Sequence, residues 1–246
     1  MFLRKWDALP DRMKTPEVRT YYEILSRRKI DLAAKRLFDV VAAALMLVIL
    51  AIPMLLIAAA IVIDSPGGAL YRQTRVTAYG KEFYIHKFRT MEANADKAGS
   101  LVTVSHDRRI TRVGGFLRKY HLDEVPQLLD VLVGNMSYVG TRPEIPQYVR
   151  QYTDEMMATL LLPAGITSEA SILYQDEAKW LDASRDVDRI YMERILPGKM
   201  YYNLRSIERF GFWRDIRIIF MTVFAMLGRT YTGDGEPEKR PEFIRK

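Results

Sequence analysis

The chain has 246 residues with a formal net charge of +7, and it contains no cysteine. This length suits one domain, or one domain plus appendages, and the missing thiols exclude a disulfide framework and thiolate catalysis. The three histidines are scattered without zinc-ligand spacing, which argues against a structural zinc site. The positive charge predicts an anionic partner: a membrane surface, a phosphorylated substrate or nucleic acid.

Four segments follow one another along the chain. Residues 1–34 are charged and mixed, and we expect them to form short helices at a membrane surface. Residues 35–64 contain the run Val40–Ile63, which carries no charge and is long enough to cross a bilayer. Residues 65–231 carry the remaining predicted elements. Residues 232–246 are rich in glycine, proline and charge, and are expected to be disordered.

The apolar segment is predicted to enter the membrane and return to the same side. Pro53 near its middle removes a backbone hydrogen bond and predicts a kink or break. Both flanks are basic, and the positive-inside rule places such flanks in the cytoplasm. The flanking residues are Arg27, Arg28, Lys29, Lys35 and Arg36 before the segment, and Arg72, Arg75, Lys81, Lys87 and Arg89 after it. A re-entrant helix–break–helix satisfies both flanks, whereas a buried soluble helix rarely stays apolar all round for this length.

Alternating aromatic and β-branched residues next predict a β-hairpin with strands at Ala69–Arg75 and Glu82–Arg89. The elements expected after the hairpin are a short helix through Phe116 and Leu117, a helix from about Asp123 to Leu132, a strand at Met136–Val139, an amphipathic helix at Pro146–Leu161, a loop at Leu161–Thr167 and a charged helix at Asp182–Leu196. Together with the apolar segment they predict an α+β, membrane-associated fold, in which a re-entrant anchor and interfacial amphipathic helices surround a small α/β core.

The last predicted helix, Gly211–Gly228, has apolar residues at helical spacing. A core helix and an in-plane membrane helix both fit this pattern, the latter because of Trp213 and a basic start.

Two adjacent carboxylates, Asp123 and Glu124, stand before Val-Pro and an apolar stretch. Adjacent acids repel one another, so the pair needs a physical reason. Helix capping is one, because Asp is a favoured N-cap and Glu is favoured in a first turn.

Several motifs occur in a fixed order: KRLFD (Lys35–Asp39), the proline-containing apolar segment, YRQTRV…GKEF…KFRTM (Tyr71–Met91), ITRVGGFLRKYHLDEVPQLLDVLVGNMSYVGTRPE (Ile110–Glu144) and PAGIT (Pro163–Thr167). With this combination, the chain from about Lys35 to Leu227 closely resembles the bacterial sugar transferases, the monotopic polyprenyl-phosphate phosphoglycosyl transferases that start surface-glycan assembly.

The resemblance implies a membrane reaction on the cytoplasmic face of the bacterial inner membrane. The family transfers a sugar-1-phosphate from a UDP-sugar to polyprenyl (undecaprenyl) phosphate, which gives polyprenyl-diphosphate-sugar and UMP. This is the first membrane step of polysaccharide or glycoconjugate biosynthesis. The Asp of the family's Asp-Glu pair is the nucleophile of a covalent phosphosugar intermediate, and Mg²⁺ is required.

On this chain the resemblance makes Asp123 the nucleophile, and Asp123 and Glu124 the catalytic and magnesium-binding pair. The chemistry is sound, because a carboxylate can attack phosphorus and magnesium can neutralise the anionic diphosphate. A helix N-terminus at the pair would also favour bound phosphate, so capping and catalysis are compatible.

Basic residues near these motifs are candidates for binding the substrate phosphates: Arg142, Lys87, Arg89 and Arg118. Arg142 is the foremost, since a guanidinium matches phosphate oxygens in a bidentate way and the family's Pro-Arg-Pro motif falls there. For each of them a solvated charge or a structural ion pair is the alternative. Gln73 and Arg75 rank lower, and Arg36 and Asp39 are expected to anchor the start of the membrane helix.

The chain departs from the family pattern at several positions. Ile52-Pro53 replaces a frequent Ser-Pro, Thr77 replaces a hairpin glycine, and His86 stands where Tyr is frequent. Thr141-Arg142-Pro143 replaces Pro-Arg-Pro, and Thr does not fix φ as Pro does, so the direction of Arg142 is less constrained.

Three other functions would account for parts of this sequence. A membrane-bound hydrolase of nucleotide-sugar diphosphates would use water as acceptor, but soluble substrates need no membrane segment. A catalytically degenerate membrane-anchored scaffold would not need the intact Asp-Glu pair. Nucleic-acid binding is suggested only by the positive charge, and the sequence contains no recognised nucleic-acid-binding motif. No motif in the sequence identifies the donor sugar. The segment Ser168–Lys199, with Tyr174, Gln175 and Trp180, is a candidate for determining sugar specificity, and core packing is the alternative role for these residues.

Overall fold

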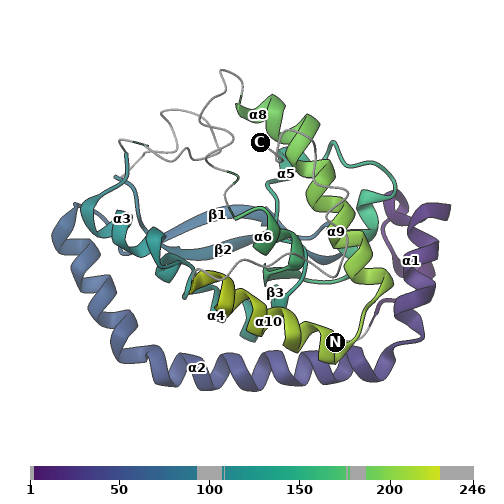
Figure 1. Cartoon of the computed structure of the whole chain (residues 1–246), viewed down its shortest axis with the longest axis horizontal. Coiled ribbons are helices and arrows are strands. Elements are labelled where there is room, and N and C mark those ends of the chain that lie inside the picture. The colour runs from purple at the N-terminus through teal and green to yellow at the C-terminus, as the bar shows by residue number, and fades with distance from the viewer. Residues whose placement is uncertain (1–2, 93–106, 108, 176, 178–186, 228–246) are drawn as a thin grey trace.

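The computed structural model describes residues 3–92, 107, 109–175, 177 and 187–227 as an α+β protein (Figure 1). Its helices are α1 (Pro16–Ser26), α2 (Lys29–Asp64), α3 (Arg112–Lys119), α4 (Gln127–Val133), α5 (Pro146–Val149), α6 (Glu169–Leu173), α8 (Val187–Ile190), α9 (Leu196–Glu208) and α10 (Phe212–Met226). Its strands are β1 (Leu70–Val76), β2 (Glu82–Phe88), β3 (Met136–Val139) and β4 (Ala164–Thr167). Trp180 and the tail from residue 232 lie outside the described residues.

The largest hydrophobic cluster joins the N-terminal helix α1 to α9 and to the 3₁₀ helix Met156–Leu161. Val18, Tyr21 and Leu25 form the buried face of α1, at the spacing of successive helical turns. Helix α1, in the middle of this N-terminal segment, therefore packs into the core through one face. Its contact with a membrane surface stays a prediction.

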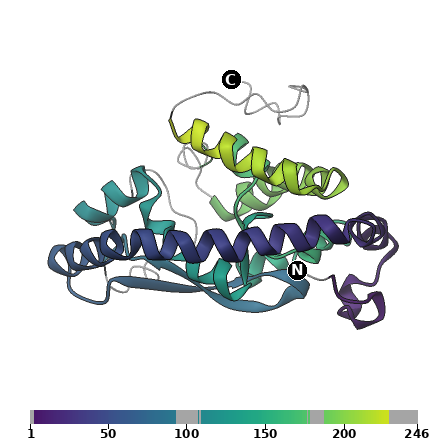
Figure 2. The same ribbon diagram turned by 90° about the horizontal axis from the view of Figure 1, so that it is seen from below.

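The apolar segment lies inside a single helix, α2, which has 36 residues and contains Pro53. An interruption at Pro53 is therefore absent, and α2 instead changes direction in its second half (Figure 1). A proline removes one backbone hydrogen bond, which can bend a helix without ending it. Seen from below, α2 crosses the width of the molecule (Figure 2). Its most apolar 18 residues have a mean hydropathy of 3.1 and are only 6% buried, so an apolar surface faces outward.

The first turns of α2 are attached to the rest of the fold by buried polar contacts. The Lys35 ammonium donates to Asp215 Oδ2 of α10 at 2.6 Å and to the Val139 carbonyl of β3 at 2.7 Å. Asp39 Oδ1 accepts a hydrogen bond from Ser137 Oγ at 3.1 Å. Each of these groups is costly to bury unless it is paired, so the contacts define how α2 lies against β3 and α10.

The last turn of α2 is attached to the same unit. Asp64 Oδ2 accepts from the backbone N–H of Val113 in α3 at 2.9 Å. Arg89, at the end of the hairpin, donates to the carbonyl of Ser65 at 2.7 Å and to that of Pro66. Both ends of the apolar helix are therefore tied to one folded body.

The two small sheets differ in how well the sequence predicts them. β1 and β2 pair antiparallel, with Leu70 opposite Phe88, as expected for the hairpin. β4 pairs parallel with β3, so the prediction of a loop at Leu161–Thr167 is wrong. A four-residue strand carries too little local pattern to be recognised, and it exists because β3 supplies its hydrogen-bond partner.

Two predicted helices also differ from the structure. The helix expected at Pro146–Leu161 ends at Val149 and resumes only as a 3₁₀ helix from Met156, where the Thr153 hydroxyl accepts from the Met156 N–H and competes with helical bonding. The charged helix expected at Asp182–Leu196 lies partly outside the described residues. From Val187 it is helical and continues through a π-helical turn into α9.

Helix α3 approaches the end of β2 through a contact that only glycine permits. A Cβ atom on Gly114 would lie 2.1 Å from the carbonyl oxygen of Thr90, which is too close for any packed structure. A Cβ on the neighbouring Gly115 would meet nothing nearer than Ile110 Cγ2 at 4.0 Å.

We expect Gly114→Ala to displace α3 from Thr90 and to lower the free energy of unfolding by more than about 1 kcal/mol. Gly115→Ala is the matched control, and is expected to be neutral or stabilising by up to about 1 kcal/mol because alanine favours the helix. Thermal unfolding of the two detergent-solubilised variants measures the difference. Equal melting temperatures would show that α3 does not depend on this contact.

Candidate active site

The Asp123–Glu124 pair lies on a 3₁₀ turn, Leu122–Glu124, between α3 and α4. Helix α4 begins only at Gln127, and no side chain caps it. The predictions that a helix starts at Asp123 and that Asp123 caps it are therefore wrong. Pro126 has no N–H and fits the entrance of a helix rather than its interior, so the pair is left on the turn that precedes α4.

Glu124 is bound by two cations from separate elements. Lys87 of β2 donates to Glu124 Oε1 at 2.8 Å. Arg142, in the loop after β3, donates from Nη1 to Oε2 at 3.2 Å and from Nη2 to Oε1. Burial would raise the pKa of Glu124, but the charges and hydrogen bonds of Arg142 and Lys87 outweigh it and keep that pKa well below its usual range. Glu124 is therefore an ionised carboxylate whose oxygens already have partners.

Asp123 has the opposite surroundings. It is only 8% exposed, yet no side-chain hydrogen bond joins it to the residues that the structure describes. Burial raises the pKa of Asp123 and the Glu124 charge raises it further, while Lys87, Arg118 and Arg142 act in the other direction. Its carboxylate oxygens are thus free to react, in a positive field that is suited to an anionic substrate.

The cations keep donors for a further anion. A guanidinium has five N–H groups and an ammonium three, so the bonds to Glu124 leave donors on both Arg142 and Lys87. Burial lowers the pKa of Lys87, and the Glu124 charge opposes that shift. A phosphate can therefore be bound without releasing Glu124.

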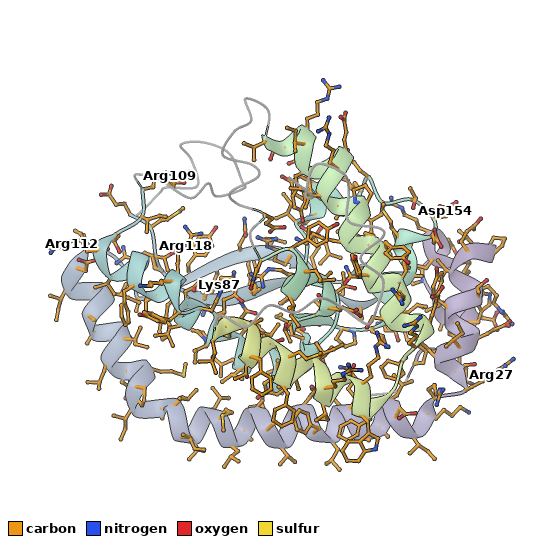
Figure 3. The ribbon with its side chains drawn as sticks, viewed as in Figure 1. Arg27, Lys87, Arg109, Arg112, Arg118 and Asp154 are labelled. Atoms are coloured by element: carbon orange, nitrogen blue, oxygen red, sulfur yellow. The ribbon has the colours of Figure 1, made fainter. Side chains whose placement is uncertain are left out.

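The predicted phosphate ligands do not all meet at the pair. Lys87 and Arg142 contact Glu124, and Arg118 of α3 lies close enough for its charge to lower the pKa of Asp123 (Figure 3). Arg89 instead donates to the backbone after α2, as described above. Phosphate binding by any of these residues stays a prediction.

Residues that sequence reasoning did not assign to the site fix β2 beside Lys87. Asp130 of α4 is buried, and its Oδ2 accepts from the backbone N–H of His86 at 2.9 Å. Its Oδ1 lies 2.9 Å from the His86 ring nitrogen Nδ1. Because His86 precedes Lys87 in β2, this contact fixes the position of Lys87 relative to α4.

A second set of contacts supports the loop that carries Arg142. Arg75 Nη1 donates to the Pro143 carbonyl at 3.0 Å and lies 4.0 Å from Glu144 Oε2. The Tyr191 hydroxyl donates to Glu144 Oε1. Glu144 belongs to the Thr-Arg-Pro-Glu motif, but Tyr191 lies on a distant π-helical turn and carries no local signal. Arg75, ranked low as a substrate ligand, is thus a support for the loop.

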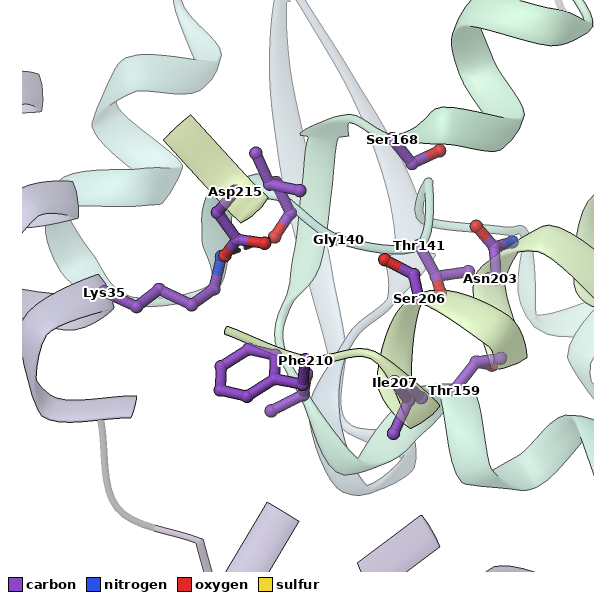
Figure 4. A pocket seen from close by; sticks show the side chains of 12 residues that line it. Lys35, Gly140, Thr141, Thr159, Ser168, Asn203, Ser206, Ile207, Phe210 and Asp215 are labelled. Atoms are coloured by element: carbon purple, nitrogen blue, oxygen red, sulfur yellow. Dashed lines mark hydrogen bonds and ion pairs between the residues drawn. The ribbon is translucent and has the colours of Figure 1, made fainter. Parts of the chain in front are cut away.

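A small cavity lies behind the same loop (Figure 4). It has a volume of about 30 Å³ and is lined in part by Thr141, Ser168 and Asn203, with the Lys35–Asp215 pair at one end. Ligand pockets usually measure about 300–1,000 Å³, so this cavity is too small for a nucleotide sugar.

The carboxylate pair is compatible with magnesium. Among the described residues no group of three or more His, Cys, Asp or Glu side chains is placed to hold a metal. Magnesium in phosphoryl-transfer sites commonly takes one or two carboxylates together with substrate phosphates, and Asp123 with Glu124 fits that pattern. Asp123 is the better ligand of the two, because the Glu124 oxygens already accept from Lys87 and Arg142.

Comparison with known proteins identifies the family of this chain. Residues 30–229 match the model of the family described as "Bacterial sugar transferase". Exopolysaccharide production protein PSS of Rhizobium leguminosarum bv. phaseoli is 45% identical over 215 residues, covering 81% of this chain and 98% of that protein. A putative undecaprenyl-phosphate N-acetylgalactosaminyl 1-phosphate transferase of Bacillus subtilis (strain 168) is 40% identical over 149 residues, covering 60% of this chain and 82% of the relative.

Other relatives are longer. A UDP-glucose:undecaprenyl-phosphate glucose-1-phosphate transferase of Xanthomonas campestris pv. campestris is 36% identical over 177 residues, which are 70% of this chain. The match covers 34% of that relative, so the chain spans about a third of its length. Since the family model spans most of the chain and includes Asp123, Glu124 and Arg142, the chain belongs to the bacterial sugar transferase family.

Proposed function

We propose that this protein transfers a sugar-1-phosphate from a UDP-sugar to polyprenyl (undecaprenyl) phosphate, giving polyprenyl-diphosphate-sugar and UMP. The observation that carries the proposal is the pairing of a buried Asp123, free of hydrogen bonds in the described part of the chain, with a Glu124 bound by Lys87 and Arg142. The names of the relatives support the same reaction type. The reaction would be the first membrane step in the biosynthesis of a polysaccharide or glycoconjugate.

The proposed mechanism has two displacements at one phosphorus atom. An Asp123 carboxylate oxygen attacks the phosphorus that bears the sugar, the bond from that phosphorus to the bridging oxygen breaks, and UMP leaves with the bridging oxygen. An oxygen of polyprenyl phosphate then attacks the phosphosugar, and the bond to Asp123 breaks. The electron pair returns to the carboxylate, so the enzyme is regenerated. Splitting the transfer in this way replaces one difficult step by two easier ones.

Several groups of the chain would offset the negative charge in both steps. Arg142 and Lys87 hold Glu124 and offer their remaining donors to the diphosphate, while Arg118 faces Asp123 from α3. When bound by Asp123 and Glu124, Mg²⁺ would supply further neutralisation of the phosphate oxygens. Arg142 is the strongest candidate for a phosphate clamp because its planar fork is fixed by Glu124.

The membrane arrangement is proposed to be monotopic, on the cytoplasmic face of the inner membrane. Both ends of α2 bind the same folded body, through Lys35 at one end and Asp64 at the other. Contacts at both ends with one folded body favour a helix that returns to the side of the bilayer from which it entered. Two features support a re-entrant anchor: the change of direction in the second half of α2 (Figure 1) and the outward apolar surface of that helix.

The covalent step is tested first by Asp123→Asn. Wild-type protein incubated with a UDP-sugar and no acceptor is expected to release UMP and to gain the mass of one phosphosugar on Asp123. In the Asn variant the rate should fall by at least about 10³-fold, because an amide is a poor nucleophile. Asp154→Asn, an exposed carboxylate far from the site in Figure 3, is the matched control and should react like wild type. An active Asn variant, or an adduct mapped elsewhere, would remove Asp123 from the mechanism.

The same incubation separates the transferase from a hydrolase. Sustained release of free sugar phosphate without a lipid acceptor would indicate a hydrolase.

The pH dependence of adduct formation tests the electrostatics. Only ionised Asp123 is nucleophilic, so the rate should decline as the pH falls through the Asp123 pKa, which burial raises above that of an ordinary Asp. Arg118 lowers that pKa, so Arg118→Gln should move the acid limb of the profile to higher pH. Lys119→Gln removes an equal charge from an exposed neighbour and should leave the limb in place. An unmoved limb in Arg118→Gln would mean that the titrating group is not Asp123.

The topology can be measured with single cysteines, since the chain has none of its own. Arg27→Cys precedes α2, and Gly68→Cys follows it at a position with open space around a new Cβ. In sealed inverted inner-membrane vesicles, a membrane-impermeant thiol reagent is expected to label both positions, and in intact spheroplasts neither. Labelling of either position in spheroplasts would contradict a re-entrant helix.

A further inference from the structure

A buried lysine in the first turn of α9 holds an acidic side chain that the proposed mechanism does not use. Lys199 is only 5% exposed, and its ammonium donates to Glu177 Oε2 at 2.8 Å. The Glu177 side chain is itself 31% exposed. An ionised carboxylate has about four lone-pair positions, so the Glu177 oxygens can accept further hydrogen bonds from a ligand.

Contacts connect this acid to the loop that follows β3. The Lys199 ammonium also donates to the Tyr191 hydroxyl at 3.4 Å, and that hydroxyl donates to Glu144. An unbroken line of contacts therefore leads from the part-exposed carboxylate to the loop that carries the predicted phosphate clamp, and its members are Glu177, Lys199, Tyr191, Glu144 and, through Arg75, the Pro143 carbonyl.

The charge of Glu177 also acts on that clamp. The Glu124 charge raises the pKa of Arg142 most strongly, and the Glu177 charge raises it further. Glu177 therefore lies near the guanidinium to which the proposed mechanism assigns the diphosphate. A UDP-sugar carries hydroxyl groups on both sides of its diphosphate, on the sugar and on the ribose, so such groups come within reach of a carboxylate in this place.

The hairpin face beside Lys87 adds a fixed hydrogen-bond donor. Tyr71 lies opposite Lys87 in the β1–β2 pair, so their side chains share one face. Gln73 and Arg75 follow on that face, because side chains alternate along a strand. Arg75 donates from Nε and Nη2 to Gln73 Oε1 at 3.0 and 2.7 Å, which holds the amide oxygen toward Arg75 and directs the NH₂ group elsewhere. Hydroxyl groups both donate and accept, so an amide and a carboxylate together suit a sugar or a ribose.

We propose that Glu177 accepts hydrogen bonds from hydroxyl groups of the UDP-sugar, and that Lys199 holds its carboxylate in position. The inference rests on the proposed function and adds a residue that recognises the donor substrate. A lone carboxylate beside a diphosphate would repel it, and the paired ammonium of Lys199 offsets that repulsion. The hydroxyl groups belong to the sugar or to the ribose, which present the same chemistry. The alternative is that Glu177 serves only as the counter-ion of a buried lysine.

The experiment measures binding without turnover, in the Asp123→Asn background. The ligand is the UDP-sugar that binds this protein most tightly in a panel of UDP-hexoses, measured by calorimetry. Glu177→Gln keeps the shape of the side chain and removes its charge, and its Kd for the UDP-sugar should rise about tenfold, because hydrogen bonds to charged groups are the stronger ones. Glu193→Gln is the matched control, since Glu193 pairs with Arg189 on the surface, and its Kd should not change.

Two further ligands separate the sources of the hydroxyl groups. A loss of affinity for the UDP-sugar but not for UDP assigns the contact to the sugar. A loss that extends to UDP and is absent with 2′,3′-dideoxy-UDP assigns it to the ribose. In either case, unchanged binding of the dideoxy ligand shows that the site is intact.

Two results would overturn the proposal. One is an unchanged Kd for the UDP-sugar in Glu177→Gln. The other is an equal loss with all three ligands, because a displaced Arg142 loop would weaken every diphosphate alike. Failure of the proposed function has a separate signature, namely no phosphosugar adduct in the wild-type protein, and the binding measurements do not depend on that adduct.

Discussion

The ion cluster of Glu124 with Lys87 and Arg142 is the interaction on which the site depends. Glu124 sits on the turn before α4, Lys87 on β2 and Arg142 after β3, so one carboxylate joins three elements. Two neighbouring acids acquire different properties as a result. The pKa of Glu124 is lowered by its cations and that of Asp123 is raised by burial, so the environment separates two chemically similar groups. Glu124 supplies fixed charge, and Asp123 keeps free lone pairs.

Stability alone does not explain such a cluster. The desolvation of buried charges largely offsets their mutual attraction, so well-packed apolar side chains could stabilise the fold as well. The physical consequence of the cluster is instead that it fixes the positions of Lys87 and Arg142 beside Asp123. Without Glu124, Lys87 and Arg142 would face each other across the site as like charges. The Glu124 carboxylate holds Lys87 and Arg142 in position, and both cations keep donors for an incoming phosphate.

Helix α2 is part of this arrangement and cannot be regarded as a detachable anchor. Ala43 of α2 is fully buried in a cluster with Val131 of α4 and Met136 of β3. Arg36 donates to the carbonyls of Val131 and Leu132 at the end of α4, at 2.7 and 2.9 Å. The helix that carries the outward apolar surface is therefore packed directly on the helix that follows the carboxylate pair. The fold therefore fixes the distance between the carboxylate pair and the apolar surface of α2.

The sequence predicts those parts of the molecule whose signals are local. The hairpin, β3, α10 and the apolar helix each carry a periodic pattern within their own residues, and Asp123 with Glu124, Lys87 and Arg142 follows from motifs. The start of α4, the strand β4 and the contact of Tyr191 with Glu144 could not be predicted in this way. Each of these depends on partners far along the chain or on the stereochemistry of one proline, which periodicity does not report.

The direction of Arg142 shows how such a distant partner acts. The sequence constrains this direction less than the family pattern does, because Thr141 does not fix φ as a proline would. In the structure the backbone around Thr141 is bound to β4: the Gly140 N–H donates to the Thr167 carbonyl at 3.0 Å, and the Gly165 N–H donates to the Thr141 carbonyl at 2.9 Å. The two backbone segments approach so closely that a Cβ on Gly165 would lie 2.2 Å from the Gly140 nitrogen. The strand that the sequence does not reveal thus supplies the constraint that the missing proline would have given, because it holds the residue before Arg142 by hydrogen bonds.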